Sequence, residues 1–197
     1  MHKSFNFAWR LLIGSLVFLS AGCSAYSTAT AEEPAAATDT MEGEMLKLTS
    51  SAFANNGEMA NRYAYKMGNQ CNGENYSPAL HWEDAPEGTR SFTLTMIDPD
   101  GGNWVHWLLV NLPPDLTSLE ESIGGPEMGI AGRNSFGKDG YGGPCPPSGT
   151  HHYVFTLYAL DITLEAKQGV TLKEVKSQME GHILAQSDWI GLKSAGK

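Results

Sequence analysis

The sequence predicts one mainly β domain, and three observations lead to this prediction. Residues 91–96 alternate apolar and hydroxyl side chains, which is the period of a half-buried strand. Residues 104–112 and 152–160 are apolar on both faces, as strands covered on both sides are. The stretch 124–150 contains nine glycines and several prolines, which argues against regular structure and predicts a long loop that is either functional or disordered.

Length and charge narrow the classes of protein. The chain has 197 residues, 41% of them hydrophobic, which is typical of a single globular domain. It carries 13 basic and 22 acidic residues, a formal charge of −9. Such a balance argues against nucleic acid as a partner and against a polybasic membrane-surface protein.

The N-terminal residues 1–22 have the pattern of a secretory signal. Lys3 and Arg10 precede the apolar residues 11–19, a stretch too short to span a bilayer, which takes about 20 helical residues. The sequence Leu-Ser-Ala-Gly-Cys at 19–23 resembles the lipobox of bacterial lipoproteins.

That resemblance implies a lipid on Cys23 and anchoring in the cell envelope. Ser24 after the cysteine implies the outer membrane, facing the periplasm, if the cell is Gram-negative. The alternative is an ordinary signal peptide in which Cys23 occurs by chance. We favour the lipobox because small residues occupy both positions before the cysteine.

A tether and the folded domain follow. Residues 23–44 are rich in Ala, Thr and Ser and predict a disordered tether, because they bury too little surface to offset chain entropy. The domain is expected at 45–197, with a first short strand at 45–49. Near its end, Thr171 and Glu174 form a capping box, and apolar residues recur at helical spacing. The sequence therefore predicts a helix packed on the outside, with the stripe Leu172, Val175, Met179 and Ile183.

Cys71 and Cys145 remain if Cys23 carries lipid. An even pair in an oxidising compartment favours a disulfide. Two buried free thiols or a thiol metal site are the alternatives, and the absence of a Cys-x-x-Cys arrangement makes the metal site the weaker of them.

Side chains able to carry chemistry occur in two clusters. Asp98 and Asp100 flank a proline at a strand end, and His106 lies in the next strand. A plain polar turn and a satisfied core histidine are the alternatives to a site. The second cluster is the glycine-rich segment 140–149, whose backbone N–H groups are expected to form an anion-binding nest, followed by His151 and its neighbours.

Several spaced motifs, in order, resemble the phosphatidylethanolamine-binding protein family, which includes the Raf kinase inhibitor proteins. The match is closest to the bacterial branch of the family and runs from about residue 48 to 190. The motifs are Asn75-Tyr76-Ser77-Pro78-Ala79-Leu80-His81-Trp82, Asp98-Pro99-Asp100, His106-Trp107, Val110-Asn111, Gly140-Tyr141, Pro146-Pro147 with Gly149, His151, Tyr153 and Tyr158-Ala159-Leu160-Asp161.

The resemblance implies a β-sandwich of a large and a small sheet with a few peripheral helices. It also implies a small pocket for phosphate, phosphoryl headgroups or acetate-like anions. An Asp beside a His would favour the imidazolium, which holds an anion by charge-assisted hydrogen bonds. Asp100 is expected to orient the histidine and the loop. The residues expected in or around the pocket are Asp98, Asp100, His106, Tyr141, Cys145, Pro147, His151 and Tyr153.

Other positions are assigned lesser roles. His152 is expected to be exposed or structural, and His182 to have a packing role on the helical stripe. Gly101-Gly102 replaces the Ala-Pro usual in the family, so we expect a mobile rim. Leu192 stands where many members have Tyr, which removes an aromatic wall.

Three functions from different classes follow. The leading hypothesis is a membrane-anchored, non-enzymatic protein that binds a small anion without metal or cofactor. The second is a regulator or inhibitor of a periplasmic or host protease, acting through the loops at the pocket rim. The third is a metal-dependent enzyme with iron or zinc on Asp98, His106 and His151.

Overall fold

The structure is a computed structural model that describes residues 45–68, 71–123, 125 and 128–196. The predicted signal peptide, Cys23 and the tether lie outside the described residues. The elements are β1 (Lys47–Thr49), β2 (Gly57–Glu58), the 3₁₀ turn η1 (Asn61–Tyr63), β3 (Lys66–Met67), β4 (Cys71–Asn72), β5 (Tyr76–Ser77), β6 (Leu80–Glu83), β7 (Ser91–Asp98), β8 (Trp104–Leu112), β9 (Ser118–Leu119), β10 (Ser122–Ile123), β11 (Ile130–Ala131), β12 (Thr150–Leu160), α1 (Leu172–Met179) and β13 (Ile183–Ser194).

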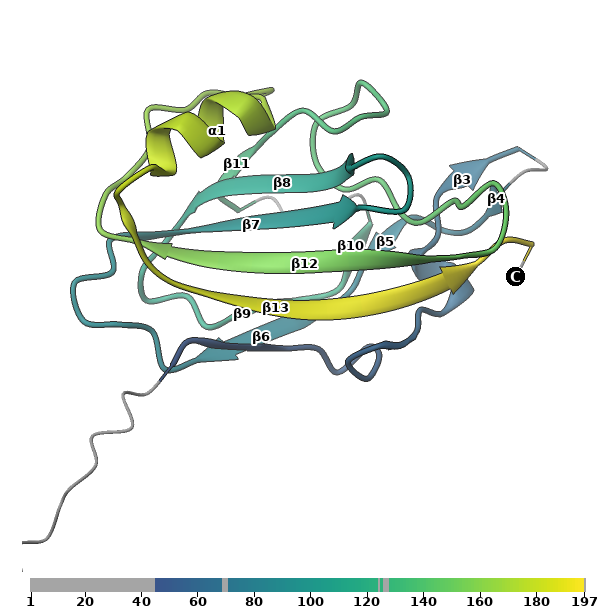
Figure 1. Cartoon of the computed structure of the whole chain (residues 1–197), viewed down its shortest axis with the longest axis horizontal. Helices are drawn as coiled ribbons and strands as arrows, with labels where there is room; N and C mark the ends of the chain where they lie inside the picture. The colour runs from purple at the N-terminus through teal and green to yellow at the C-terminus, as the bar shows by residue number, and fades with distance from the viewer. Residues whose placement is uncertain (1–44, 69–70, 124, 126–127, 197) are drawn as a thin grey trace, which may run out of the picture. The chain divides into compact units, whose positions relative to one another are not determined.

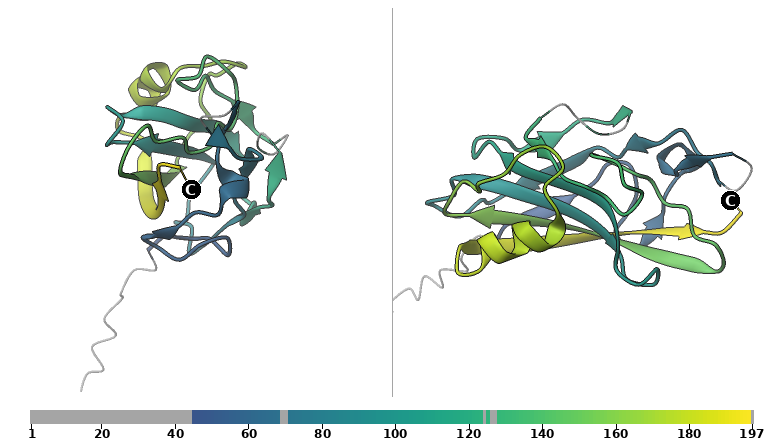
Figure 2. Two further views of the ribbon diagram at one scale, coloured as in Figure 1. Left: turned by 90° about the vertical axis from the view of Figure 1, so that its right-hand side faces the viewer. Right: turned by 90° about the horizontal axis from the view of Figure 1, so that it is seen from above.

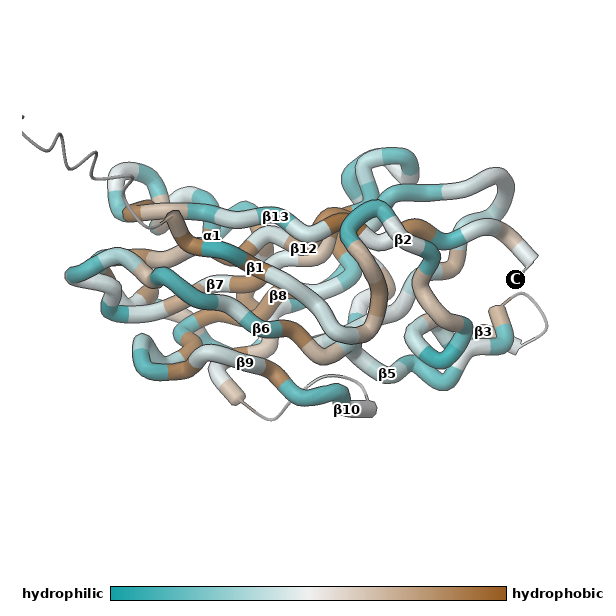
Figure 3. Tube along the Cα trace, turned by 90° about the horizontal axis from the view of Figure 1, so that it is seen from below, coloured by the Kyte–Doolittle hydropathy of each residue, from teal (hydrophilic) through white to brown (hydrophobic). Residues whose placement is uncertain are grey.

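The strands form a large and a small sheet, which confirms the predicted β-sandwich class. The large sheet has the order β11-β8-β7-β12-β13-β2, and its long strands β8, β7, β12 and β13 run side by side in Figure 1. These long strands pair antiparallel, whereas the short β2 pairs parallel with β13. The small sheet has the order β1-β6-β9 and is seen from below in Figure 3. Two-stranded ladders join β10 to β5 and β3 to β4.

Two apolar clusters cover the two faces of the large sheet. The larger one fills the space between the sheets, where β7 contributes Phe92, Leu94 and Met96 and β6 contributes Leu80 and Trp82. The smaller one lies under α1 and joins Leu108, Val110 and Leu160 of the sheet to Val175 and Met179 of the helix. Figure 2 shows the helix against one side of the long strands.

Strand β7 departs from the half-buried strand that the alternation predicts. The hydroxyl residues Thr93 and Thr95 are buried as completely as their apolar neighbours. Thr95 pairs with Leu108, which belongs to the cluster beneath the helix, so its face of the sheet is covered too. The alternation was therefore a correct strand signal and a wrong burial signal.

The helix begins where predicted and ends earlier. Thr171 Oγ1 accepts from the Glu174 N–H at 3.3 Å, and the Glu174 carboxylate accepts from the Thr171 N–H at 2.8 Å, which completes the capping box. The helix ends at Met179, and Gly181 has a φ of 78°, a left-handed conformation that suits glycine. Ile183 is consequently exposed and begins β13 instead of extending the stripe.

His182 also differs from its predicted packing role. It lies in the turn between α1 and β13, and its side chain is about half exposed. Its ring Nδ1 donates to Asp161 Oδ1 at 2.8 Å, so a surface hydrogen bond replaces the packing contact. In the described part of the chain, no helix is both long and apolar enough to cross a membrane.

Replacing Thr171 with Ala should lower the free energy of unfolding by about 1 kcal/mol, because the helix then loses its N-cap acceptor. Urea unfolding followed by circular dichroism measures the change. Ser177→Ala, at an exposed position of the same helix, is the control and should leave the midpoint nearly unchanged. Equal losses in both variants would contradict the capping role.

Candidate functional site

The topology of the large sheet brings the predicted site residues to one sheet end. β7 ends at Asp98, which pairs with Trp104 at the start of β8. β12 starts at Thr150 and runs antiparallel to β7, so its first residues lie at the same end. The β7–β8 hairpin and the start of β12, which are distant in sequence, therefore place their polar side chains together.

A cavity of about 470 Å³ lies at this end of the sheet. Its wall combines carboxylates, imidazoles, aromatic rings and the loop. No Lys or Arg is among the described residues of that wall. The lining residues are Met67, Asp98, Asp100, Gly101, Trp104, His106, Phe136, Cys145, Pro147, Ser148 and His151.

Asp98 and His151 form a buried pair in this wall. The His151 Nδ1–H donates to Asp98 Oδ2 at 2.7 Å, and the two side chains are only 13% and 5% exposed. The other carboxylate oxygen accepts from the Gly101 N–H at 2.8 Å. A Cβ on Gly101 would lie 2.7 Å from Asp98 Oδ2, so this tight turn requires glycine. The Gly101 backbone is thus hydrogen-bonded to the carboxylate, while the mobility expected of this rim stays a prediction.

His106 is held differently from the expected imidazolium. Its Nδ1 donates to the Gly142 carbonyl at 2.6 Å and lies 3.1 Å from the Gly143 carbonyl. Burial lowers the pKa of His106, although the two carbonyls and the charge of Asp98 act in the opposite direction. The ring is therefore neutral at pH 7, with Nε2 as a hydrogen-bond acceptor.

Asp100 contacts the neighbouring histidine. One carboxylate oxygen accepts from both the backbone N–H and the ring Nδ1 of His152, at 2.7 and 2.9 Å. The backbone hydrogen bond makes the largest contribution, and together the two hydrogen bonds hold the pKa of Asp100 below its ordinary value. Asp100 thus orients the start of β12 and also lines the cavity, while His152 is exposed.

The two predicted tyrosines do not line the cavity. Tyr153 is fully buried behind it, with its ring 5.0 Å from the His106 ring in an edge-on contact. Burial raises the pKa of Tyr153. Tyr141 lies in the core against Trp107, and its hydroxyl donates to the Tyr63 carbonyl at 2.8 Å. Both aromatic rings support the wall from behind.

The middle of the glycine-rich segment uses its backbone donors within the protein. The Gly142 N–H donates to the His106 carbonyl at 2.9 Å, and the Gly143 N–H donates to Asn75 Oδ1 at 2.8 Å. The prolines at 144, 146 and 147 have no N–H. These five positions therefore do not contribute to an anion-binding nest, and a nest from the rest of the segment stays a prediction.

A disulfide joins Cys71 and Cys145, the pairing favoured from the sequence, with the Cα atoms 5.8 Å apart. Cys71 pairs across the β3–β4 ladder with Met67, and both Met67 and Cys145 line the cavity. The disulfide therefore ties one wall of the cavity to the β3–β4 ladder.

An aromatic side of the cavity was missed by the sequence analysis. The ring of Phe136 stacks on Tyr65 at 4.2 Å and meets the edges of Trp104 and His106 at 5.5 and 5.4 Å. Trp104 is two residues before His106 in one strand, so the period of two places both on one face and was a usable signal. Phe136 lies in the irregular loop and gave no such signal.

Two observations bear on the metal-enzyme alternative, which stays a hypothesis. Within the described residues, no group of three or more His, Cys, Asp or Glu side chains is placed to hold a metal ion. His106 and His151 each direct Nδ1 at a protein acceptor, one a carbonyl and the other a carboxylate.

Burial of His106 should make the folded state less stable as the pH is lowered. Its folded-state pKa lies below the ordinary value of 6.5, so the unfolded chain binds the proton first as the pH falls below about 6.5. The contribution to stability is present above that pH and is lost below it. Replacing His106 with Gln should make the decline in unfolding free energy from pH 7 to pH 5 shallower, as measured by urea titrations.

His81→Gln is the control for this measurement, because His81 is exposed on β6. It should keep the pH dependence of the unaltered chain. An unchanged slope in His106→Gln would show that burial of this ring does not govern the acid sensitivity.

Comparison with known proteins identifies relatives of this chain. Residues 49–194 match the phosphatidylethanolamine-binding protein family. A UPF0098 protein of Methanothermobacter thermautotrophicus is 41% identical over 157 residues, covering 77% of this chain and 100% of that protein. The UPF0098 protein YbhB of Escherichia coli K12 is 38% identical over 152 residues, covering 72% and 96%.

Two solved structures share the fold. A phosphatidylethanolamine-binding protein homologue from Chlamydia trachomatis superposes with a TM-score of 0.68 at 34% identity, covering 76% of this chain and 97% of that one. YbcL of E. coli, described as a member of the mammalian family, has a TM-score of 0.70 at 31% identity, covering 76% and 98%. The chain therefore belongs to the phosphatidylethanolamine-binding protein family.

Proposed function

We propose that this protein is a non-enzymatic binding protein that holds a small phosphorylated amine, of the phosphoethanolamine type, in the cavity beside Asp98 and His151. The observation that carries the proposal is the placement of two imidazoles and two carboxylates in one wall, with an aromatic ring beside them. Such a wall matches a ligand with both an acidic and a basic group.

The imidazoles suit the phosphoryl end of the ligand. With Nδ1 of His151 held by Asp98, its remaining ring nitrogen is left for a ligand. His106, neutral and with Nδ1 bound to a carbonyl, has Nε2 as an acceptor for the P–OH of a phosphate monoanion. The hydroxyl of Ser148 at the same wall is a further donor.

The carboxylates and Trp104 suit the amine end. Asp100 is 42% exposed at its side chain, and Trp104 is 40% exposed at the mouth of the cavity. An ammonium group is attracted both to a carboxylate and to the face of an indole ring. Because the described wall has no Lys or Arg to balance two carboxylates, a zwitterion suits it better than a simple anion.

Phosphoethanolamine should bind the full chain with saturable shifts of the His106 and His151 ring signals in NMR titrations. Inorganic phosphate and ethanolamine should each bind at least about tenfold more weakly, because each satisfies only one end of the wall. Affinity for phosphoethanolamine should rise as the pH falls from 8 to about 6, because the second pKa of a phosphate ester is about 6 and the neutral Nε2 of His106 accepts from the P–OH of the monoanion.

His182→Asn is the matched control for His151→Asn. Both histidines donate Nδ1–H to an aspartate, at 2.8 and 2.7 Å, but His182 is at the surface beside α1. The proposal requires loss of binding in His151→Asn alone. If neither ring signal of the unaltered chain moves at millimolar ligand, the protease-regulator hypothesis takes its place, and the exposed loops at the rim become the surface to test.

We further propose that Cys23 carries lipid and anchors the domain in the cell envelope, in the outer membrane of a Gram-negative cell. The sequence Leu-Ser-Ala-Gly-Cys at 19–23 supports this. In Cys23→Ser the protein should leave the membrane fraction, because several acyl chains supply the anchoring. Cell fractionation and the intact mass measure this, with Cys71→Ser as the control that keeps the anchor. Membrane association of Cys23→Ser would contradict the proposal.

A further inference from the structure

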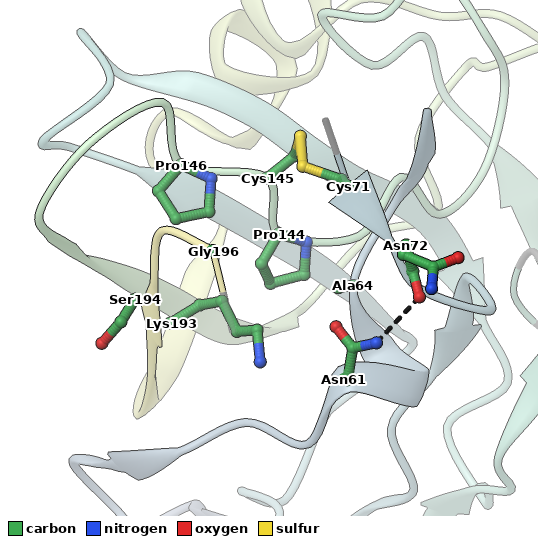
Figure 4. A pocket seen from close by; sticks show the side chains of 10 residues that line it. All are labelled: Asn61, Ala64, Cys71, Asn72, Pro144, Cys145, Pro146, Lys193, Ser194 and Gly196. Carbon is green, nitrogen blue, oxygen red and sulfur yellow. Dashed lines mark hydrogen bonds between the residues drawn. A yellow bond between two sulfur atoms is a disulfide. The ribbon is translucent and has the colours of Figure 1, made fainter. Parts of the chain in front are cut away.

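The disulfide between Cys71 and Cys145 lies where two cavities meet. Cys145 belongs to the wall of the cavity proposed above for the phosphorylated amine, and both cysteines line a second cavity of about 290 Å³. Figure 4 shows the bond joining the proline segment 144–146 to the strand that carries Asn72. Both cysteines are half-buried. The bond is therefore open to a small thiol.

This exposure distinguishes the disulfide from one that is enclosed in a core. Neither cysteine belongs to the two apolar clusters formed by the described residues. Exchange requires a thiolate to reach one of the two sulfurs, and exposed disulfides are more easily reduced than enclosed ones, so they include the regulatory ones. The position of this bond thus suits a reversible contact.

The disulfide holds a strand ladder that has little support of its own. Among the described residues, β3 and β4 form a separate sheet of two strands, with two residues in each. An isolated two-stranded sheet is at best marginally stable in water. Met67 of β3 pairs with Cys71 of β4, and Met67 belongs to the wall of the amine cavity. The place of Met67 in that wall therefore depends on the bond to Cys145.

Other contacts hold the base of the ladder and the loop, so a change in the disulfide stays local. The Tyr65 N–H, just before β3, donates to the Pro144 carbonyl at 2.9 Å. The Gly143 N–H donates to Asn75 Oδ1 at 2.8 Å. These hydrogen bonds do not involve either cysteine. Opening the disulfide should thus release Met67 and leave the loop in place.

We propose that the Cys71–Cys145 disulfide is a redox switch that controls ligand affinity in the amine cavity. The disulfide form holds Met67 in the wall and binds the ligand more tightly, and the dithiol form releases this part of the wall. The inference rests on the proposed function. Its physical basis is that a wall ordered in advance lowers the entropy cost of binding.

The reductant that opens the switch is a dithiol. One of its thiolates attacks a sulfur of the pair, the S–S bond breaks, and the other cysteine leaves as a thiolate that takes up a proton. The second thiol then attacks the reductant's own sulfur in the mixed disulfide. This releases the remaining cysteine, which also takes up a proton. The protein disulfide gains two electrons, and the dithiol becomes a disulfide.

The first test uses no ligand. The full chain with Cys23→Ser leaves the disulfide pair as its only cysteines, and dithiothreitol serves as the dithiol. After reduction, NMR should show a narrower Met67 methyl signal and faster amide hydrogen exchange at Lys66 and Met67. The ring signals of His106 should change little, because the loop stays in place. Unchanged exchange in the ladder would overturn the proposal, and so would unfolding of the whole domain.

The second test compares the affinity of the two forms for phosphoethanolamine by NMR titration. The reduced chain should bind at least about fivefold more weakly. Because binding and reduction are linked, saturating phosphoethanolamine should raise, by the same factor, the ratio of reduced to oxidised dithiothreitol at which half of the chain is reduced. Equal affinities in the two forms would overturn the switch alone. Absence of binding by the disulfide form would overturn the proposed function as well.

Variants make the test specific. The double variant Cys71→Ala with Cys145→Ala should have the affinity of the reduced chain and should not respond to dithiothreitol. If it does not fold, recovery of affinity when the reduced chain is reoxidised decides. Met67→Ala should narrow the difference in affinity between the two forms. Met128→Ala is the matched control, since both methionines are 40% exposed but Met128 is not among the described residues of the cavity wall. An equal difference in these two variants would contradict the role of Met67.

Discussion

The pairing of β12 with β7 on one side and β13 on the other is the constraint on which the site depends. Because these pairs are antiparallel, the end of β7, the start of β12 and the end of β13 meet at one end of the large sheet. That end of the sheet places Asp98, His151 and Lys193 near one another, although they are far apart in sequence. The cavity beside Asp98 and His151 could not form if β12 shifted register by one residue, because every side chain of the strand would then change face.

Contacts within the protein hold the loop at residues 142–145 in place. The Pro144 carbonyl accepts from the Tyr65 N–H at 2.9 Å, Asn75 holds the Gly143 N–H, and the disulfide follows at Cys145. The carbonyls of Gly142 and Gly143 in turn hold the ring of His106. The position of this loop therefore sets the tautomer of His106, with the proton on Nδ1 and Nε2 as an acceptor.

The sequence predicted the strands and the helix start well, because alternation, apolar runs and a capping box are local signals. It missed β13, whose residues 185–188 are small or polar along a sheet edge and show no apolar period. In the site, residue types at strand ends indicated Asp98, His106 and His151. Which histidine pairs with Asp98 depends on strand neighbours, and the inward position of Tyr141 depends on core packing. Neither is a local property of the sequence.

The charges beside Asp98 and His151 give a physical basis for ligand selection on an acidic protein. With a formal charge of −9, the chain as a whole repels anions. The two carboxylates of the cavity, with no Lys or Arg among its described lining residues, add to this repulsion for a simple anion. Under the proposed function, a phosphorylated amine avoids this penalty because its ammonium group offsets the carboxylates.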